Sequence, residues 1–149
     1  MMGKALSFRL YTARGRKRRH YYRVRIFPDL DSMHEHWTEQ GIVVAGSSGG
    51  ADWQARATGW VAQYVLRRGR WRKTNCVGEV LFHSGNVGSG IVSHEMTHAA
   101  HYALSCKWEH YNTPYRDEKL AWLQGWLVFQ FWVNYYRLFP HQEPAKVSN

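Results

Sequence analysis

Alternating apolar and polar residues open the chain and predict a pair of strands. Residues 6–11 and 22–26 both alternate in this way, a strongly basic segment separates them, and Pro28 follows. A period of two is typical of a strand with one buried face. We therefore expect a basic hairpin over residues 6–27.

The middle of the chain predicts one short helix and two further strands. Residues 29–40 place Leu30, Met33 and Trp37 at helical spacing, which indicates a short surface helix. Aromatic and branched residues over 59–66 and a short apolar run over 77–82 indicate strands. The glycine-rich segment 46–50 lacks the lysine of a phosphate-binding loop, so we interpret it as a connection.

Two longer helical patterns end the chain, one over about 90–106 and one over about 114–139. Thr113 can cap the second helix and Pro114 suits its first position. Residues 120–136 carry no charge, but this run is short for a membrane span, so we expect no span and a helix packed in the core. Its expected core stripe is Trp122, Trp126, Phe129, Val133 and Tyr136. Strands followed by helices predict an α+β fold.

The first of these helices contains an HExxH motif, with His94, Glu95 and His98 in its key positions. Residues four apart on a helix differ by about 40° in direction and about 6 Å in height, so both imidazoles can reach one point. Glu95 lies on the flank of that face, where it can reach a metal-bound water. The spacing supplies two metal ligands and one base.

A third ligand can come from the start of the last helix. Glu118 stands in its first turn, and two histidines with one glutamate and a water form an open catalytic zinc site. His110 is the alternative third ligand. His101 continues the histidine face but lies about 10 Å from His94 along the axis, too far to share one ion.

These residues resemble the gluzincin branch of the zincin metallopeptidases, and the short chain looks closer to its small single-domain members, the minigluzincins and the ImmA/IrrE-like small metallopeptidases. The likeness spans about residues 76–131. It implies one zinc ion per chain, a peptide or protein substrate, and Glu95 as the base that activates water. It also implies a small zincin-like domain with a twisted, mostly antiparallel sheet. The edge strand of that sheet, 77–82, would pack on the HExxH helix and pair with substrate near 81–83.

The sequence also departs from the thermolysin-like signature. Asp117 stands in place of an asparagine, and Trp122 stands where a supporting aspartate would lie. Asp117 is therefore a residue near the ligands rather than a match to the motif. Five side chains are candidates for stabilising an oxyanion or supporting the ligands, and the sequence does not choose among them. They are His83, His101, Tyr102, Tyr111 and Tyr115.

Length and composition agree with one cytoplasmic domain. The chain has 149 residues, which is enough for one buried core, and its first residues lack the apolar stretch of a signal peptide. Its two cysteines, Cys76 and Cys106, match no zinc-finger or redox spacing, so we expect them to be reduced packing residues.

A net charge of +9 favours acidic or polyanionic partners. Part of this charge lies in the tip of the predicted hairpin, at Arg14, Arg16, Lys17, Arg18 and Arg19. This tip is either a phosphate-contacting loop or a solvated turn. Two function classes follow: a zinc metallopeptidase, or a basic, nucleic-acid-associated binding or regulatory protein on a zincin frame, SprT-like or catalytically silent.

Overall fold

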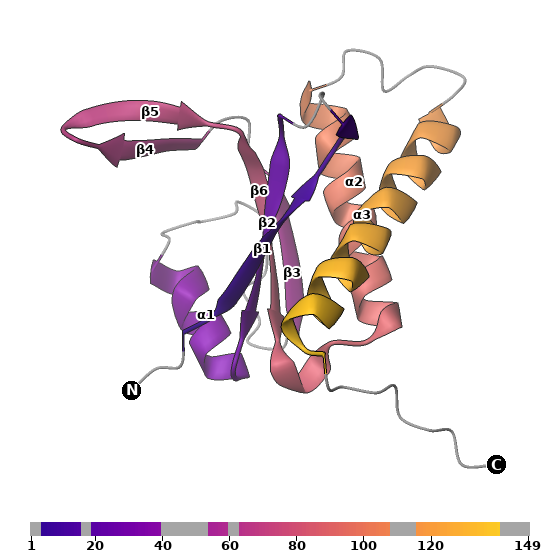
Figure 1. The fold of residues 1–149 in the computed structure, drawn as a ribbon, viewed down its shortest axis with the longest axis horizontal. Coiled ribbons are helices and arrows are strands. Elements are labelled where there is room, and N and C mark those ends of the chain that lie inside the picture. Colours follow the sequence, from indigo (N-terminus) through magenta and orange to yellow (C-terminus); the bar gives the residue numbers. More distant parts are fainter. Residues whose placement is uncertain (1–3, 16–18, 40–53, 60–62, 108–115, 141–149) are drawn as a thin grey trace.

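The computed structural model describes residues 4–15, 19–39, 54–59, 63–107 and 116–140, with the backbone alone at 106, 107 and 116. It is a mixed α+β structure with two sheets (Figure 1). The strands are β1 (Leu6–Tyr11), β2 (Tyr21–Phe27), β3 (Ala55–Gly59), β4 (Gln63–Arg67), β5 (Arg70–Thr74) and β6 (Cys76–His83). The helices are α1 (Leu30–Glu39), the short 3₁₀ turn η2 (Ser84–Asn86), α2 (Ser89–Lys107) and α3 (Arg116–Leu138).

The larger sheet has the strand order β1-β2-β6-β3. β1 and β2 form the predicted antiparallel hairpin, with Leu6 opposite Ile26 and Tyr11 opposite Tyr21. β2 then runs parallel to β6, and β3 runs antiparallel to β6. Two of the three pairings are antiparallel, as expected. The parallel pair in the middle of the sheet was not predicted.

The prediction that 77–82 is the edge strand is wrong. β6 has a neighbour on each side, and β3 is the strand at that edge of the sheet. The physical reason is visible in burial: from Cys76 to Phe82 every residue of β6 is buried, and a continuous buried run is typical of a central strand covered on both faces. The predicted pairing of a substrate peptide near residues 81–83 required an edge strand, so it does not apply to β6.

The predicted strand over 59–66 is also wrong, because the chain changes sheet within it. β3 ends at Gly59, and β4 begins at Gln63 in a separate two-stranded sheet with β5. Residues 60–62 lie outside the described residues. The prediction of a strand over 59–66 was based on its bulky aromatic residues. β3 instead faces α2 with small side chains, at Ala55 and Ala57.

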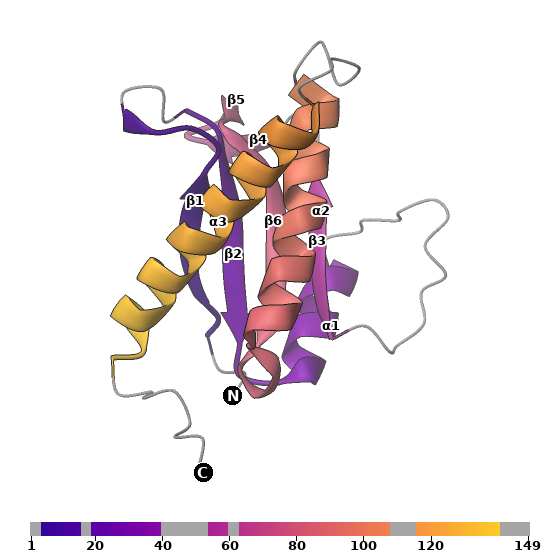
Figure 2. The same ribbon diagram turned by 90° about the vertical axis from the view of Figure 1, so that its right-hand side faces the viewer.

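Helices cover both faces of the larger sheet. α2 and α3 lie side by side on one face, with α2 over β3 and β6 and α3 over β1 (Figure 2). Their shared core includes Tyr22, Phe82 and Met96. α1 covers the opposite face, where Met33 packs with Phe27 and Leu81.

α3 buries a different stripe from the one predicted. The buried positions are Leu123, Leu127, Phe131 and Tyr135, spaced four apart. Four members of the predicted core stripe are exposed instead: Trp122, Phe129, Val133 and Tyr136. The helix is apolar on both stripes, so hydropathy alone could not select the buried one.

Polar residues within the apolar helix α3 attach it to its neighbours. The Gln130 side chain exchanges two hydrogen bonds with the Tyr11 backbone: its amide donates to the carbonyl at 2.8 Å, and its oxygen accepts from the N–H at 2.9 Å. The Gln124 amide donates to the Ser93 hydroxyl at 2.9 Å. Within the described residues, none of the helices combines the length and apolarity that a membrane crossing requires.

Candidate metal centre on helix α2

Small residues bring α2 close to the edge strand β3. Ala99, Ala100 and Ala103 of α2 are buried in the interface with the sheet. Gly59 of β3 allows the closest approach, since a Cβ atom there would lie 2.7 Å from Cβ of Tyr102. The Tyr22 hydroxyl donates a buried hydrogen bond of 2.7 Å to the Ala99 carbonyl, next to His98 in the chain. These contacts fix the motif helix on the sheet.

His94 and His98 lie together on the exposed face of α2. Their Nε2 atoms are 3.2 Å apart, and the ring planes meet at 76°. Two nitrogens that bind one tetrahedral zinc ion at 2.0–2.1 Å are about 3.3 Å apart. The pair therefore fits a shared cation. The same distance also fits one N–H···N hydrogen bond between neutral rings.

Glu95 points from the same turn of α2 toward β3. It is only 6% exposed, and the backbone of Ala57 donates a hydrogen bond to its carboxylate. Burial, the largest influence, raises the pKa of Glu95 above its usual value, and the imidazoles of His94 and His98 offset this only in part. A buried carboxylate with raised proton affinity is the pattern of a general base.

A hollow of about 280 Å³ lies between α2 and β3 at this point. Its lining consists of Ala55, Arg56, Ala57, His94, Glu95, His98 and Tyr102. The Tyr102 ring stacks on the His98 ring with centroids 6.4 Å apart. Of the predicted oxyanion or ligand-supporting residues that the structure describes, His83, His101 and Tyr102, it is Tyr102 that lines this hollow.

Comparisons of the chain with protein-family models, with curated proteins and with solved structures give no match.

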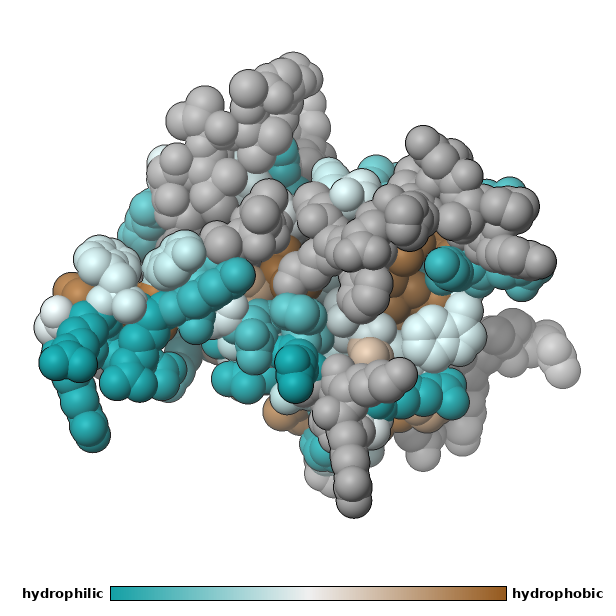
Figure 3. All heavy atoms as spheres, turned by 90° about the horizontal axis from the view of Figure 1, so that it is seen from above, coloured by the Kyte–Doolittle hydropathy of each residue, from teal (hydrophilic) through white to brown (hydrophobic). Residues whose placement is uncertain are grey.

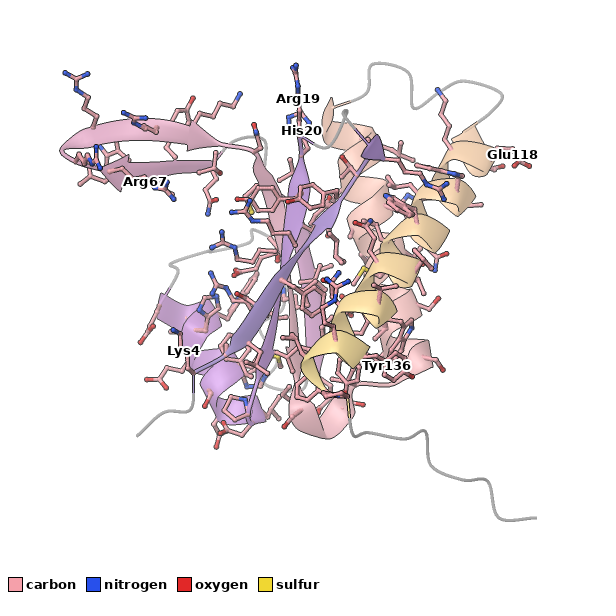
Figure 4. The ribbon with its side chains drawn as sticks, in the orientation of Figure 1. Lys4, Arg19, His20, Arg67, Glu118 and Tyr136 are labelled. Atoms are coloured by element: carbon pink, nitrogen blue, oxygen red, sulfur yellow. The ribbon has the colours of Figure 1, made fainter. Side chains whose placement is uncertain are left out.

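Glu118, the predicted third ligand, does not join the two histidines. It is exposed in the first turn of α3 and lines a different hollow with Ala103 and Leu104 (Figure 4). Because α3 starts beside the far end of α2, Glu118 lies near residues about 8 Å beyond His98 along the helix axis. Within the described ranges, no three His, Cys, Asp or Glu side chains form a group that could hold a metal ion.

The remaining predicted site residues lie in several places. Asp117 is exposed beside Glu118, and His101 is half-buried on α2. His83 ends β6, where its ring nitrogen lies 3.0 Å from the Gln54 side-chain oxygen. Three predicted residues lie outside the described residues: His110, Tyr111 and Tyr115.

Sequence reasoning missed Arg56. Its guanidinium lies 4.2 Å from the centre of the Trp37 ring, and its charge helps to lower the pKa of Glu95 against the effect of burial. The signal was the alternation of residues 55–58, in which two small alanines are separated by an arginine. That pattern marks a strand with one tightly packed face.

Sequence reasoning also missed a buried ion cluster on the other side of the sheet. Glu79 of β6 is buried and pairs with Arg25 of β2, and its second oxygen lies 3.2 Å from Nε2 of His36 on α1. Burial acts to raise the pKa of Glu79, but the hydrogen bonds from His36 and Arg25 outweigh it and lower the pKa overall. This cluster joins α1 to the sheet.

The predicted basic loop is described at its two ends. Arg14 places its guanidinium 4.4 Å from the centre of the Trp126 ring and 5.6 Å from that of Trp122. Arg19 is exposed just before β2. Arg16, Lys17 and Arg18 lie outside the described residues.

Proposed function

We propose that this chain is a zinc-dependent peptidase whose centre is built by His94, Glu95 and His98. The observation that supports this most directly is the 3.2 Å separation of the two Nε2 atoms beside a buried carboxylate. Two exposed imidazoles whose nitrogens are spaced as around a tetrahedral zinc ion, with a base on the same helical turn, are the parts of a hydrolytic zinc site.

Each residue has one task in this proposal. His94 and His98 would hold the metal, which when bound polarises a water molecule and the carbonyl of the substrate. Glu95 takes the proton of the water and passes it to the departing amine. The Ala57 backbone, which donates to the Glu95 carboxylate, orients this base. The Tyr102 ring lies nearly parallel to the His98 ring at the edge of this centre.

The edge strand β3 is the element that suits an extended substrate. Within the described residues it pairs with β6 alone, and a strand paired on one side is what strand addition uses. It lines the hollow together with His94, Glu95 and His98. A peptide that pairs with β3 would therefore pass close to the two histidines. β3 takes the role that was predicted for residues 77–82.

The third protein ligand distinguishes two versions of this proposal. Glu118 is not beside the histidine pair, and the sequence offers His110 as the alternative. His110 lies outside the described residues. Zinc binding by Glu118→Gln and His110→Ala therefore decides between the two residues.

The proposal is tested by Glu95→Gln, with Glu35→Gln on the surface of α1 as the matched control. Removing the general base should lower the hydrolysis of an unstructured protein substrate by about 10²- to 10⁴-fold while zinc stays bound. The control should cleave at the wild-type rate. Cleavage by Glu95→Gln at the wild-type rate, or zinc-loaded wild-type protein without any cleavage, would contradict the peptidase proposal.

A further inference from the structure

The two-stranded sheet formed by β4 and β5 projects from the body of the molecule as an arm (Figure 1). Neither strand joins the larger sheet. Large side chains on the arm are exposed, and Trp71 reaches 70%. An isolated two-stranded hairpin is only marginally stable in water, so such an arm gains most when it binds a partner.

The arm carries a high density of positive charge. Residues 63–74 contain Arg67, Arg68, Arg70, Arg72 and Lys73, and the sequence has no acidic residue from 53 to 78. Figure 3 shows hydrophilic side chains along the arm where it extends from the body. The charge is therefore not neutralised within the arm itself.

The strand register places three of these five charges on one face. Arg67 stands directly opposite Arg70, and Arg72 stands opposite Val65, so all three arginines share a face. The other face carries Tyr64, Leu66, Trp71 and Lys73. Like charges directly opposite each other destabilise a hairpin. Contact with an anion would remove that repulsion.

The turn of the arm also carries backbone strain. Arg68 and Gly69 both have positive φ angles, 50° and 72°, as a tight type I′ turn requires. Glycine adopts this conformation readily, whereas an arginine at the first position is disfavoured. Strain at an exposed tip is a common mark of a functional segment. Here it keeps one more guanidinium at the end of the arm.

The base of the arm is fixed although its tip is exposed. The Thr74 hydroxyl donates to the Gln63 side-chain oxygen at 2.9 Å, and it accepts from the Cys76 N–H at 3.3 Å. The Tyr21 N–H donates to the Asn75 carbonyl at 3.0 Å, which joins the arm to β2. The arm is thus presented by the sheet rather than attached through a free linker.

We propose that the β4–β5 arm binds duplex nucleic acid. The major groove of DNA, about 12 Å wide, admits a two-stranded ribbon, and arginines make strong, paired hydrogen bonds to phosphate oxygens. An arm that lies in a groove has a phosphate backbone along each of its two edges, so the arginines of β4 and of β5 can both reach phosphates. A flat lipid surface has no such walls beside a ribbon. Arg19 lies at the same end of the molecule as Arg67 (Figure 4).

The test uses the whole protein and a fluorescent, mixed-sequence DNA duplex, with fluorescence anisotropy recorded over a series of salt concentrations. The arm variant is Arg67→Gln, Arg70→Gln and Arg72→Gln combined. The matched control removes three exposed charges elsewhere, in Lys4→Gln, Lys119→Gln and Arg137→Gln combined. Circular dichroism checks that both variants fold like the wild type.

The arm variant should bind the duplex about tenfold or more weakly than the wild type, because three phosphate contacts are lost. The slope of log affinity against log salt should fall by about 2 to 3. The control should keep most of the affinity, and Glu95→Gln should bind like the wild type, so this result is independent of the peptidase proposal.

Three results would overturn the inference. The first is wild-type affinity in the arm variant. The second is an equal loss in the arm variant and in the control, which would indicate a general effect of net charge. The third is arginine-dependent binding to vesicles that contain phosphatidylglycerol without binding to the duplex, which would indicate a lipid surface as the partner.

Discussion

The α2–β3 region and the β4–β5 arm hold their functional side chains in opposite ways. In the α2–β3 region, small residues bring a helix against a strand, and a buried Glu95 lies within the contact. In the arm, two strands pair with each other, and their arginines face solvent. A catalytic group must be held in one geometry, whereas a phosphate-binding surface needs reach and charge. The two proposals therefore assign the two tasks to separate parts of the chain.

Two glycines test the difference in packing most strongly. Gly59→Ala should lower the free energy of unfolding by about 1–3 kcal/mol, because the added methyl group overpacks the contact with Tyr102. Gly69→Ala adds a methyl group where nothing lies within 4 Å, and its cost of about 1 kcal/mol comes from the positive φ angle alone.

Thermal and denaturant unfolding measure both glycine variants. Gly59→Ala should lower the midpoint of global unfolding. Gly69→Ala should leave that midpoint nearly unchanged, because the arm opens without the core. Equal midpoint shifts in the two variants would show that the arm and the core unfold as one unit, which would remove the contrast between the regions.

The Glu79 cluster tests how much the contact between α1 and the sheet contributes to the free energy of unfolding. Glu79→Gln should destabilise the fold by about 1–3 kcal/mol at neutral pH, because Arg25 and His36 lose their charged partner. The folded-state pKa of Glu79 is lowered, so its contribution is present above the unfolded-state value near 4.5 and is lost as the pH falls below it.

Urea unfolding of wild type and Glu79→Gln at several pH values checks this prediction. The difference between the two proteins should shrink as the pH falls below about 4.5. Glu39→Gln, an exposed change at the end of α1, serves as the control and should match the wild type throughout. A difference that grows in acid would mean that the pKa of Glu79 is raised by its surroundings.

Glu118→Gln should have the smallest effect. Glu118 is exposed and lies beside Ala103 and Leu104 rather than beside the histidines. Zinc affinity in this variant should therefore stay within a few-fold of the wild type, as is usual for an exposed surface substitution. Isothermal titration with zinc measures it. A large loss of affinity would restore Glu118 as the third ligand and would require α3 to move toward the centre of α2.

The sequence was informative where the deciding interactions are local. The α2 helix and the convergence of His94 and His98 follow from helical spacing, which needs no knowledge of distant residues. The β1–β2 hairpin follows from alternation in the same way. Glu118 was placed correctly in the first turn of a helix, but its distance from His98 depends on how α3 packs against α2.

The errors concern interactions between residues far apart in the chain. The central position of β6 depends on its pairing with both β2 and β3. Its unbroken burial, seen in the structure, agrees with a strand that is covered on both faces. The exposed stripe of α3 could not be distinguished from the buried one because both are apolar. The charges of the arm are readable from the sequence, but the placing of Arg67, Arg70 and Arg72 on one face requires the register of β4 against β5.

A zinc-binding isotherm of wild type and His98→Ala tests the proposal that His94 and His98 share one zinc ion. A shared ion requires one zinc per wild-type chain. It also requires a loss of affinity of more than about a hundredfold in the variant, since even the neighbours of a metal ligand contribute about 10- to 100-fold. Wild-type protein that binds no stoichiometric zinc, or His98→Ala with wild-type affinity, would contradict it.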